Sequence, residues 1–350
     1  KMTNLKYLLA VLVIGSLLVC NHAMSAESGS FDLSDNELKL GLDAFLDDDT
    51  LLLADALSPD KQEGSSTENT NQKKEPTDEE IAEAINNPLS YLWLLWVQND
   101  TTWFKGDLLD QFGEDDLVMN TTLIQPVMPM QLTENWKMIF RPIIPINSFE
   151  TFSGFDVTEV ELEGPVINPQ FERETGLGDI VLWTAFSNNY TPPNIFGFGP
   201  TIMMDTASDE SLGTGKWSAG PMALAFHIGE KWIYGVVAQH WWSFAGDSDR
   251  DSVNLTDIQY VLRYRVTPTT NIGFGPNIRV NWSADSGQQW SIPVGLGADT
   301  LIKLGPLPVK IGCEAYYYVE QPDAIGPGWQ FRLIFTPVVP SPSWSQKPFF

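Results

Sequence analysis

The sequence predicts an all-β protein, a transmembrane antiparallel up-and-down β-barrel of about twelve strands, on three observations. From residue 87 onward, segments of 10–15 residues alternate between apolar and polar side chains, as strands with one face toward lipid do. Their length matches a tilted strand across a bilayer rather than an ordinary strand of about 5–6 residues. The connections alternate between short and long, as periplasmic turns and external loops do.

Composition narrows the class of protein. The 350 residues carry 45 acidic and 20 basic side chains, a formal net charge of −25. This charge argues against a nucleic-acid partner, because nucleic-acid binding needs a basic face. With 43% apolar and 12% aromatic residues, the chain as a whole is not of the disordered type, and the aromatics favour strands.

The N-terminal residues predict a signal peptide over 1–26. Lys1 and Lys6 precede an apolar run of about a dozen residues that ends at Val19, and Ala23–Ala26 offers small residues for cleavage. A membrane anchor is the alternative, but the run is shorter than the ~20 residues that a spanning helix needs. Cys20 raises a lipoprotein signal, although Val19 is not the small residue that should precede it.

Residues 27–86 form an acidic leader or linker. Residues 27–85 contain 17 acidic and 4 basic side chains, and 59–80 is almost wholly polar, which predicts a flexible, solvated segment. Thr77 and Glu80 have the spacing of a capping box and predict a short helix over Ile81–Ile85.

The predicted barrel covers 87–340 and is followed by a tail, 341–350. Eleven alternating segments follow the first long connection, and a barrel with both ends on one side needs an even number. The twelfth is Tyr91–Phe104, which barely alternates over Leu92–Val97, so a helix or an inward plug is the alternative there. The short connections lie near 131–135, 190–194, 229–231, 267–270 and 303–308, and the long ones near 105–116, 149–176, 206–216, 245–254, 283–289 and 321–327.

In five segments every charge falls on one side of the alternation, which predicts the side chains that face the lumen. They either form ion pairs that fill a narrow barrel or line a conducting path and set its selectivity. Arg263, Arg265 and Arg279 are expected to share one wall. An exported β-sandwich would show the same alternation. The predicted lumen-facing residues are Lys137, Arg141, Asp257, Gln259, Arg263, Arg265, Asn277, Arg279, Lys310, Glu314, Gln330 and Arg332.

The predicted ends of the barrel differ from its middle. The long connections hold 19 acidic and 4 basic residues, which predicts a solvated acidic surface or, alternatively, divalent-cation binding by groups such as Asp247, Asp249 and Asp251 with Asp209 and Glu210. Tryptophans near segment ends are typical of an interfacial girdle. These are Trp217, Trp232, Trp241, Trp242, Trp282, Trp290 and Trp329.

Signs of enzyme chemistry are scarce. The chain has three histidines, too few for a histidine-rich metal site, and it contains neither a G-x-S-x-G elbow nor a P-loop. The runs Gly197–Pro200 and Gly273–Pro276 lie within predicted strands, where their glycines relieve crowding or permit kinks. We therefore expect a protein that is not an enzyme and has neither a cofactor nor a metal site.

Several strings in order carry a family resemblance over about 87–340. Together they resemble bacterial outer-membrane proteins described as neuromedin-U-like, which are akin to transporter-like barrels of the phenol-degradation meta-pathway. The strings are Asn87-Pro88-Leu89, Gln98-Asn99, Ile124–Pro129, Arg141–Pro145, Gly176–Ile180, Gly213–Pro221 and Gln239–Gly246.

The resemblance implies an outer-membrane barrel that takes up small aromatic or hydrophobic compounds. The functional prediction is therefore a channel or transporter in the outer membrane of a Gram-negative bacterium, with membrane lipid and a small solute as partners. The alternative is a structural or surface-interaction barrel with a closed lumen, because twelve strands lie between small filled barrels and open porins.

Overall fold

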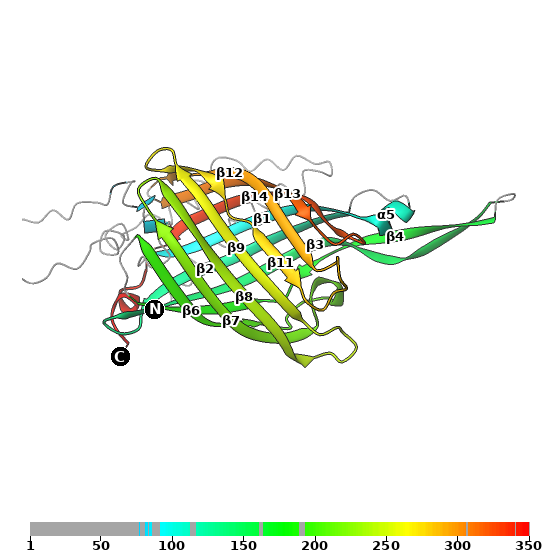
Figure 1. Cartoon of the computed structure of the whole chain (residues 1–350), viewed down its shortest axis with the longest axis horizontal. Helices are drawn as coiled ribbons and strands as arrows, with labels where there is room; N and C mark the ends of the chain where they lie inside the picture. Colours follow the sequence, from blue (N-terminus) through cyan, green and yellow to red (C-terminus); the bar gives the residue numbers. More distant parts are fainter. Residues whose placement is uncertain are drawn as a thin grey trace, which may run out of the picture.

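The chain folds into a closed antiparallel β-barrel (Figure 1). The computed structural model describes residues 77, 81–82, 84–85, 92–112, 117–160, 164–188, 193–305, 307–339 and 341–349. The predicted signal peptide and most of the acidic leader lie outside these residues. The strands are β1 (Trp93–Lys105), β2 (Leu117–Gln131), β3 (Trp136–Val160), β4 (Gly164–Leu177), β5 (Val181–Asn188), β6 (Asn194–Met203), β7 (Lys216–Ile228), β8 (Trp232–Gly246), β9 (Asn254–Arg265), β10 (Thr270–Phe274), β11 (Asn277–Asn281), β12 (Trp290–Leu304), β13 (Leu307–Glu320) and β14 (Gly326–Val339).

The fourteen strand segments make a barrel wall of twelve positions, as the sequence predicts. We call each position a stave, whether it holds one strand segment or two in line. β4 and β5 both pair with β3 and follow one another along the same stave. β10 and β11 likewise share one stave, because both pair with β9 in the same register. β1 is a strand and neither a helix nor a plug. It pairs with β14 from Trp93↔Val339 to Lys105↔Gly326, and this pairing closes the barrel.

The structure corrects the expected long loop over 149–176. β3 and β4 continue through most of this range and pair with each other as far as Val160↔Gly164. In Figure 1 this hairpin projects well beyond the barrel wall at the end opposite the C-terminus. Acidic residues outnumber basic ones by seven to one in this stretch, which makes it resemble a loop in sequence although its backbone is extended.

The stave formed by β10 and β11 is interrupted at Gly275 and Pro276. Proline has no N–H for the ladder, and the backbone of Gly275 instead meets side chains from other strands. Its N–H donates to the Tyr316 hydroxyl (3.3 Å), and its carbonyl accepts from Gln259 Nε2 (3.1 Å). The expectation that the G-F-G-P run permits a kink fits this second copy of the run.

The outer face of the barrel is apolar and aromatic. Phe198 and Leu296, each 60% exposed, lie near the middle of their strands. Exposed tryptophans lie toward strand ends, where Trp282 and Trp290 meet edge to face at 6.0 Å. Such a surface suits contact with lipid. Trp241, expected in the girdle, is instead buried and donates to the Thr201 hydroxyl (3.1 Å).

Short helices complete the described chain. α5 (Asp107–Phe112) follows β1, η1 (Glu210–Leu212) lies between β6 and β7, and η2 (Ser343–Gln346) follows β14. Among the described residues, no helix has the length and apolar character to cross a membrane. The C-terminal tail packs against the barrel, since the rings of Trp344 and Trp93 lie 5.8 Å apart.

Lipid contact on the outer face leads to the first prediction. Leu296→Arg should lower the free energy of unfolding in lipid vesicles by about 2–4 kcal/mol, because it places a cation in the hydrocarbon region. Ser286→Arg, in the exposed connection between β11 and β12, should change it little. Denaturant titrations followed by tryptophan fluorescence measure both. Equal, small effects would contradict a lipid-facing surface and favour a water-soluble fold.

Candidate functional site

Six ionised side chains form a charge network inside the barrel. It contains three carboxylates and three cations, so its formal charges cancel. Arg332 Nη1 also donates to the carbonyl of Gly275 (2.9 Å), although β13 and β12 separate β14 from that stave in the sheet. The contact therefore crosses the interior. The network consists of Asp100, Arg263, Asp299, Lys310, Glu314 and Arg332.

Arg263 and Arg332 are the two hubs of this network. Arg263 binds Asp299 and lies 2.6 Å from Glu314 through Nη2. Arg332 binds Asp100 through Nε (2.8 Å) and lies 3.7 Å from Glu314. Because all of these side chains are nearly inaccessible to solvent, each charge needs its partners to offset the loss of hydration.

Two further side chains complete the bonding of the carboxylates. Asn271 donates to Asp299 Oδ1 (2.8 Å), and Lys310 Nζ lies 3.2 Å from the same oxygen. The hydroxyl of Tyr316, which is fully buried, donates to Glu314. The network thus ties β1, β9, β12, β13 and β14 together from the inside.

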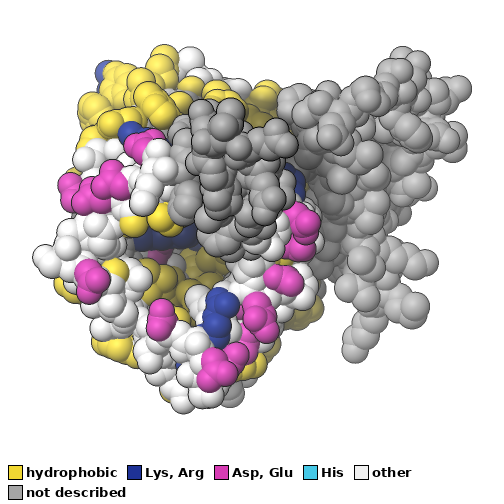
Figure 2. Space-filling model, turned by 90° about the vertical axis from the view of Figure 1, so that its right-hand side faces the viewer, with side chains coloured by type: hydrophobic (Ala, Val, Ile, Leu, Met, Phe, Trp, Pro, Cys, Tyr) yellow, Lys and Arg dark blue, Asp and Glu magenta, His cyan; other side chains and the backbone are white. Residues whose placement is uncertain are grey.

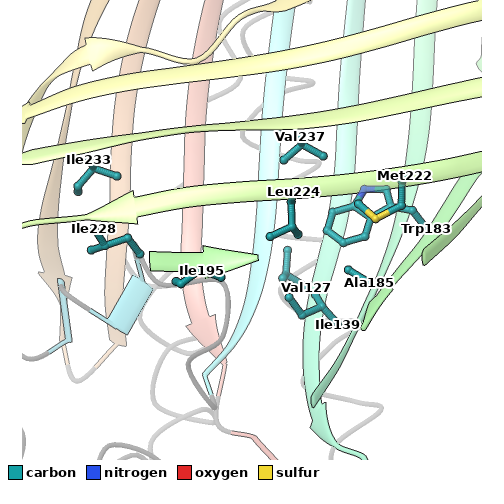
Figure 3. Packing of buried hydrophobic residues seen from close by; sticks show 10 residues of the cluster. All are labelled: Val127, Ile139, Trp183, Ala185, Ile195, Met222, Leu224, Ile228, Ile233 and Val237. Atoms are coloured by element: carbon teal, nitrogen blue, oxygen red, sulfur yellow. The ribbon is translucent and has the colours of Figure 1, made fainter. Parts of the chain in front are cut away.

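The opposite side of the interior carries a large cluster of apolar side chains, beside buried polar ones such as Arg141, Thr201 and Gln239. Figure 3 shows ten buried side chains gathered inside the curve of the barrel wall, from strands β2, β3, β5, β6, β7 and β8. We call this set the apolar wall. Since alternate residues of the same strands expose Phe196, Phe198 and Tyr234 to the outside, these strands are apolar on both faces. The apolar wall consists of Val127, Ile139, Trp183, Ala185, Ile195, Met222, Leu224, Ile228, Ile233 and Val237.

Arg141 of β3 lies beside the apolar wall. Its guanidinium carbon is 4.8 Å from the ring centre of Trp96 and 5.2 Å from that of Trp183, within the range of cation–π attraction. Its Nη2 donates to Gln125 Oε1. None of the described carboxylates forms an ion pair with Arg141, in contrast to the cations of the charge network.

The other predicted lumen residues fall into smaller groups. Asp257 accepts from Asn277 (2.8 Å) and from Arg279 Nε (3.4 Å), and the Arg279 side chain is 68% exposed. Gln330 accepts from the Tyr318 hydroxyl (2.9 Å). Lys137 is buried near the start of β3.

The three arginines expected to share a wall differ in their partners. Arg263 is neutralised within the charge network and Arg279 pairs with Asp257. Arg265 is half-buried, and its Nε and Nη2 have no hydrogen-bond partner. On the paired strands β9 and β11, the charges of Arg263 and Arg279 are thus offset by carboxylates of β9, β12 and β13.

Sequence reasoning missed Asp100, Asp299, Tyr316, Trp96 and Trp183. Asp100 and Trp96 lie in the strand with the weakest alternation, so their side of the strand was not assigned. Asp299 is a lone acid in an otherwise glycine-rich and apolar segment. A charge at mid-strand is a signal for the lumen, because the lipid face penalises it, and this signal alone could have found Asp299.

The end of the barrel that carries the long connections has an acidic rim. Figure 2 looks onto this end and shows acidic side chains around a central hollow, with basic and apolar side chains deeper inside. Ser211 donates to Asp209 from its hydroxyl (2.7 Å) and its backbone N–H (2.9 Å), and these bonds lower the pKa of that carboxyl. Among the described residues, no group of three or more side chains is arranged to hold a metal ion.

At the other end, described leader residues pack against lumen-facing side chains. Ile81 and Ile85 are buried in a cluster with Leu92 and Val338, against which Leu94 and Leu301 also pack. On three strands, a residue of this cluster lies on the same face as a residue of the charge network, because an even number of positions and no register shift separate the two. The pairs are Leu94 with Asp100, Leu301 with Asp299, and Val338 with Arg332. Ile81 and Ile85 therefore lie in the mouth of the barrel at this end.

Comparison with known proteins identifies the fold and leaves the family open. No family model matches the chain, and no curated protein matches it in sequence. An outer membrane channel from Pseudomonas putida matches with a TM-score of 0.52 and 16% identity, over 71% of this chain and 95% of that one. This match shows the same barrel fold.

Two further solved structures are more distant. A mutant of the TodX monoaromatic hydrocarbon channel matches with a TM-score of 0.40 and 8% identity, over 73% of this chain and 93% of that one. The NanC porin matches with a TM-score of 0.38 and 8% identity, over 70% and 98%.

The charge network leads to a prediction about stability. Asp299→Asn should lower the free energy of unfolding by about 3–5 kcal/mol, because it leaves buried cations without a full counter-charge. Glu150→Gln is the matched control, since its pair with Arg173 is solvent-accessible on both sides and should contribute only about 0–1 kcal/mol. Denaturant titration of the refolded barrel compares the two. A loss for Asp299→Asn no larger than the control's would show that the network does not stabilise the barrel.

The leader contact leads to a prediction about conductance. Replacing both Ile81 and Ile85 by Asp should release the leader, because carboxylates are strongly disfavoured in an apolar contact, and should raise the conductance in planar bilayers. The Ile→Val pair at the same positions keeps the contact apolar and should leave conductance unchanged. If the aspartate variant assembles and conducts like the wild type, the leader does not restrict the path.

Proposed function

We propose that this protein is an outer-membrane channel of a Gram-negative bacterium that admits small, partly apolar solutes, with aromatic compounds among them. The observation that carries this proposal is the apolar wall, because it places ten buried hydrophobic side chains on the inside of a barrel whose outside is also apolar. Ligand sites for apolar molecules combine such a lining with a few polar groups, and the charge network faces it.

The barrel's surroundings follow from the same proposal. Membrane lipid contacts the aromatic outer face, the acidic rim faces the outside, and the turn end faces the periplasm. The predicted lumen residues line and brace this path. The resemblance to neuromedin-U-like and phenol meta-pathway barrels belongs to the proposal as well, and rests on the strings in the sequence.

A second candidate is a structural barrel with a closed lumen. It is favoured by the contacts of Arg332 and Tyr316 across the interior and by the leader residues at one mouth. In this reading the lumen-facing charges only stiffen the barrel. Solute passage separates the two candidates.

The proposal predicts that narrowing the apolar wall blocks uptake. Cells that carry the protein in the outer membrane should accumulate radiolabelled phenol faster than cells without it. Leu224→Trp adds bulk inside the barrel and should reduce this gain, whereas Ala223→Trp, on the outward face of the same strand β7, should preserve it. Heat-modifiable migration on a gel verifies that both variants are assembled.

Two outcomes would contradict the channel. Uptake that does not exceed that of cells without the protein, with the wild-type barrel verified, would favour the closed structural barrel. Equal uptake by the two tryptophan variants would show that solute does not pass along the apolar wall.

A further inference from the structure

Arg141 lies between two indole rings on the lumen side of β3. Trp96 on β1 and Trp183 on β5 cover its guanidinium, and Gln125 on β2 accepts one hydrogen bond from Nη2. Four neighbouring staves thus contribute to one compact arrangement. Cation–π contacts attract the guanidinium, but they supply no counter-charge.

Several donors in this arrangement have no partner. Arg141 is 8% exposed and Trp183 is 3% exposed. Arg141 Nε and the indole nitrogens of Trp96 and Trp183 are buried and make no hydrogen bond. Buried donors and charges without partners are strongly unfavourable, and three of them at one place are unusual in a folded protein.

The cations of the charge network differ from Arg141 in this respect. Arg263 and Arg332 are also buried in the interior and Lys310 is half-buried there, and each lies within 3.7 Å of at least one carboxylate. For the described residues, the network's three carboxylates are matched by its three cations. Arg141 is thus a buried guanidinium with no carboxylate of the described chain at ion-pair distance, and Asp257 acts on its charge only from farther away.

The surroundings of Arg141 restrict what could offset its charge. Ile139 belongs to the apolar wall and Ile143 packs against it, one residue to either side on the same strand face. Val127 of the neighbouring strand and Trp183 belong to the same wall. A partner that fits therefore joins an anionic group to an apolar body of small size.

We propose that Arg141, Trp96 and Trp183 form a binding subsite for a small aromatic carboxylate within the lumen. The carboxylate receives hydrogen bonds from the guanidinium, whose planar donors match its geometry. The aromatic ring packs against the indoles and the apolar wall. This inference rests on the proposed channel function and names the solute class that the lumen prefers.

The test compares benzoate with benzyl alcohol, which has the same ring but no charge. Binding to the full-length protein, refolded in detergent at pH 7, is measured by titration calorimetry. Wild-type protein should bind benzoate about tenfold more tightly than benzyl alcohol, the difference expected from one charge-assisted contact. Arg141→Gln should lose this preference, and Arg141→Lys should keep part of it. Arg173→Gln, a change in the external hairpin, should keep it fully.

The outcomes separate this subsite from the channel itself. If the wild type binds both compounds equally, or Arg141→Gln keeps the preference, the subsite is overturned while the channel stands. If assembled wild-type protein binds neither compound, the proposed solute class and the subsite both fail.

A second pair of variants covers the case in which Arg141→Gln does not assemble. Trp96→Phe and Trp183→Phe keep an aromatic ring but remove the indole N–H, and each should weaken benzoate several-fold with little change for benzyl alcohol. Unchanged benzoate affinity in both assembled variants overturns the subsite.

Discussion

Pairing of every backbone N–H and C=O is the constraint on which this structure depends. In lipid an unpaired strand edge is prohibitive, so a sheet that crosses a membrane has to close. β1 and β14 achieve this closure through pairs that run from Trp93↔Val339 to Lys105↔Gly326. Once the sheet is closed, each stave has one lipid face and one interior face. The residues of the charge network lie on the interior face.

The two sides of the interior differ in their side-chain chemistry. On one side the buried cations and carboxylates of the charge network neutralise each other, and contacts such as Arg332 with Gly275 span several strands. On the other side the apolar wall offers a solute few hydrogen-bonding groups besides the indole N–H of Trp183. Arg141 lies beside that wall and forms no ion pair with a carboxylate of the described residues. The charge network and the apolar wall therefore occupy different sides of one barrel of twelve staves.

The sequence predicted the staves well because alternation with a period of two reports directly on the two faces of a strand. It located the twelve staves and many charges of the lumen side, but not Asp100 and Asp299. It could not pair those charges, since Arg332 meets Asp100 only after closure brings together residues 232 positions apart. The trio of Arg141, Trp96 and Trp183 depends equally on stave neighbours. The β3–β4 hairpin was missed because its acidic composition resembles that of a loop.

The pairing of β1 with β14, which we call the closing seam, also determines the order in which the barrel assembles. Every other pairing between described staves joins strands that follow each other in the chain, so each is a hairpin with a small loop to close. Only the seam between β1 and β14 joins distant segments, and its loop-closure entropy is the largest. We expect the hairpins to form first as an open, curved sheet. The Arg332–Asp100 ion pair then forms late, in the step that converts this sheet into a barrel.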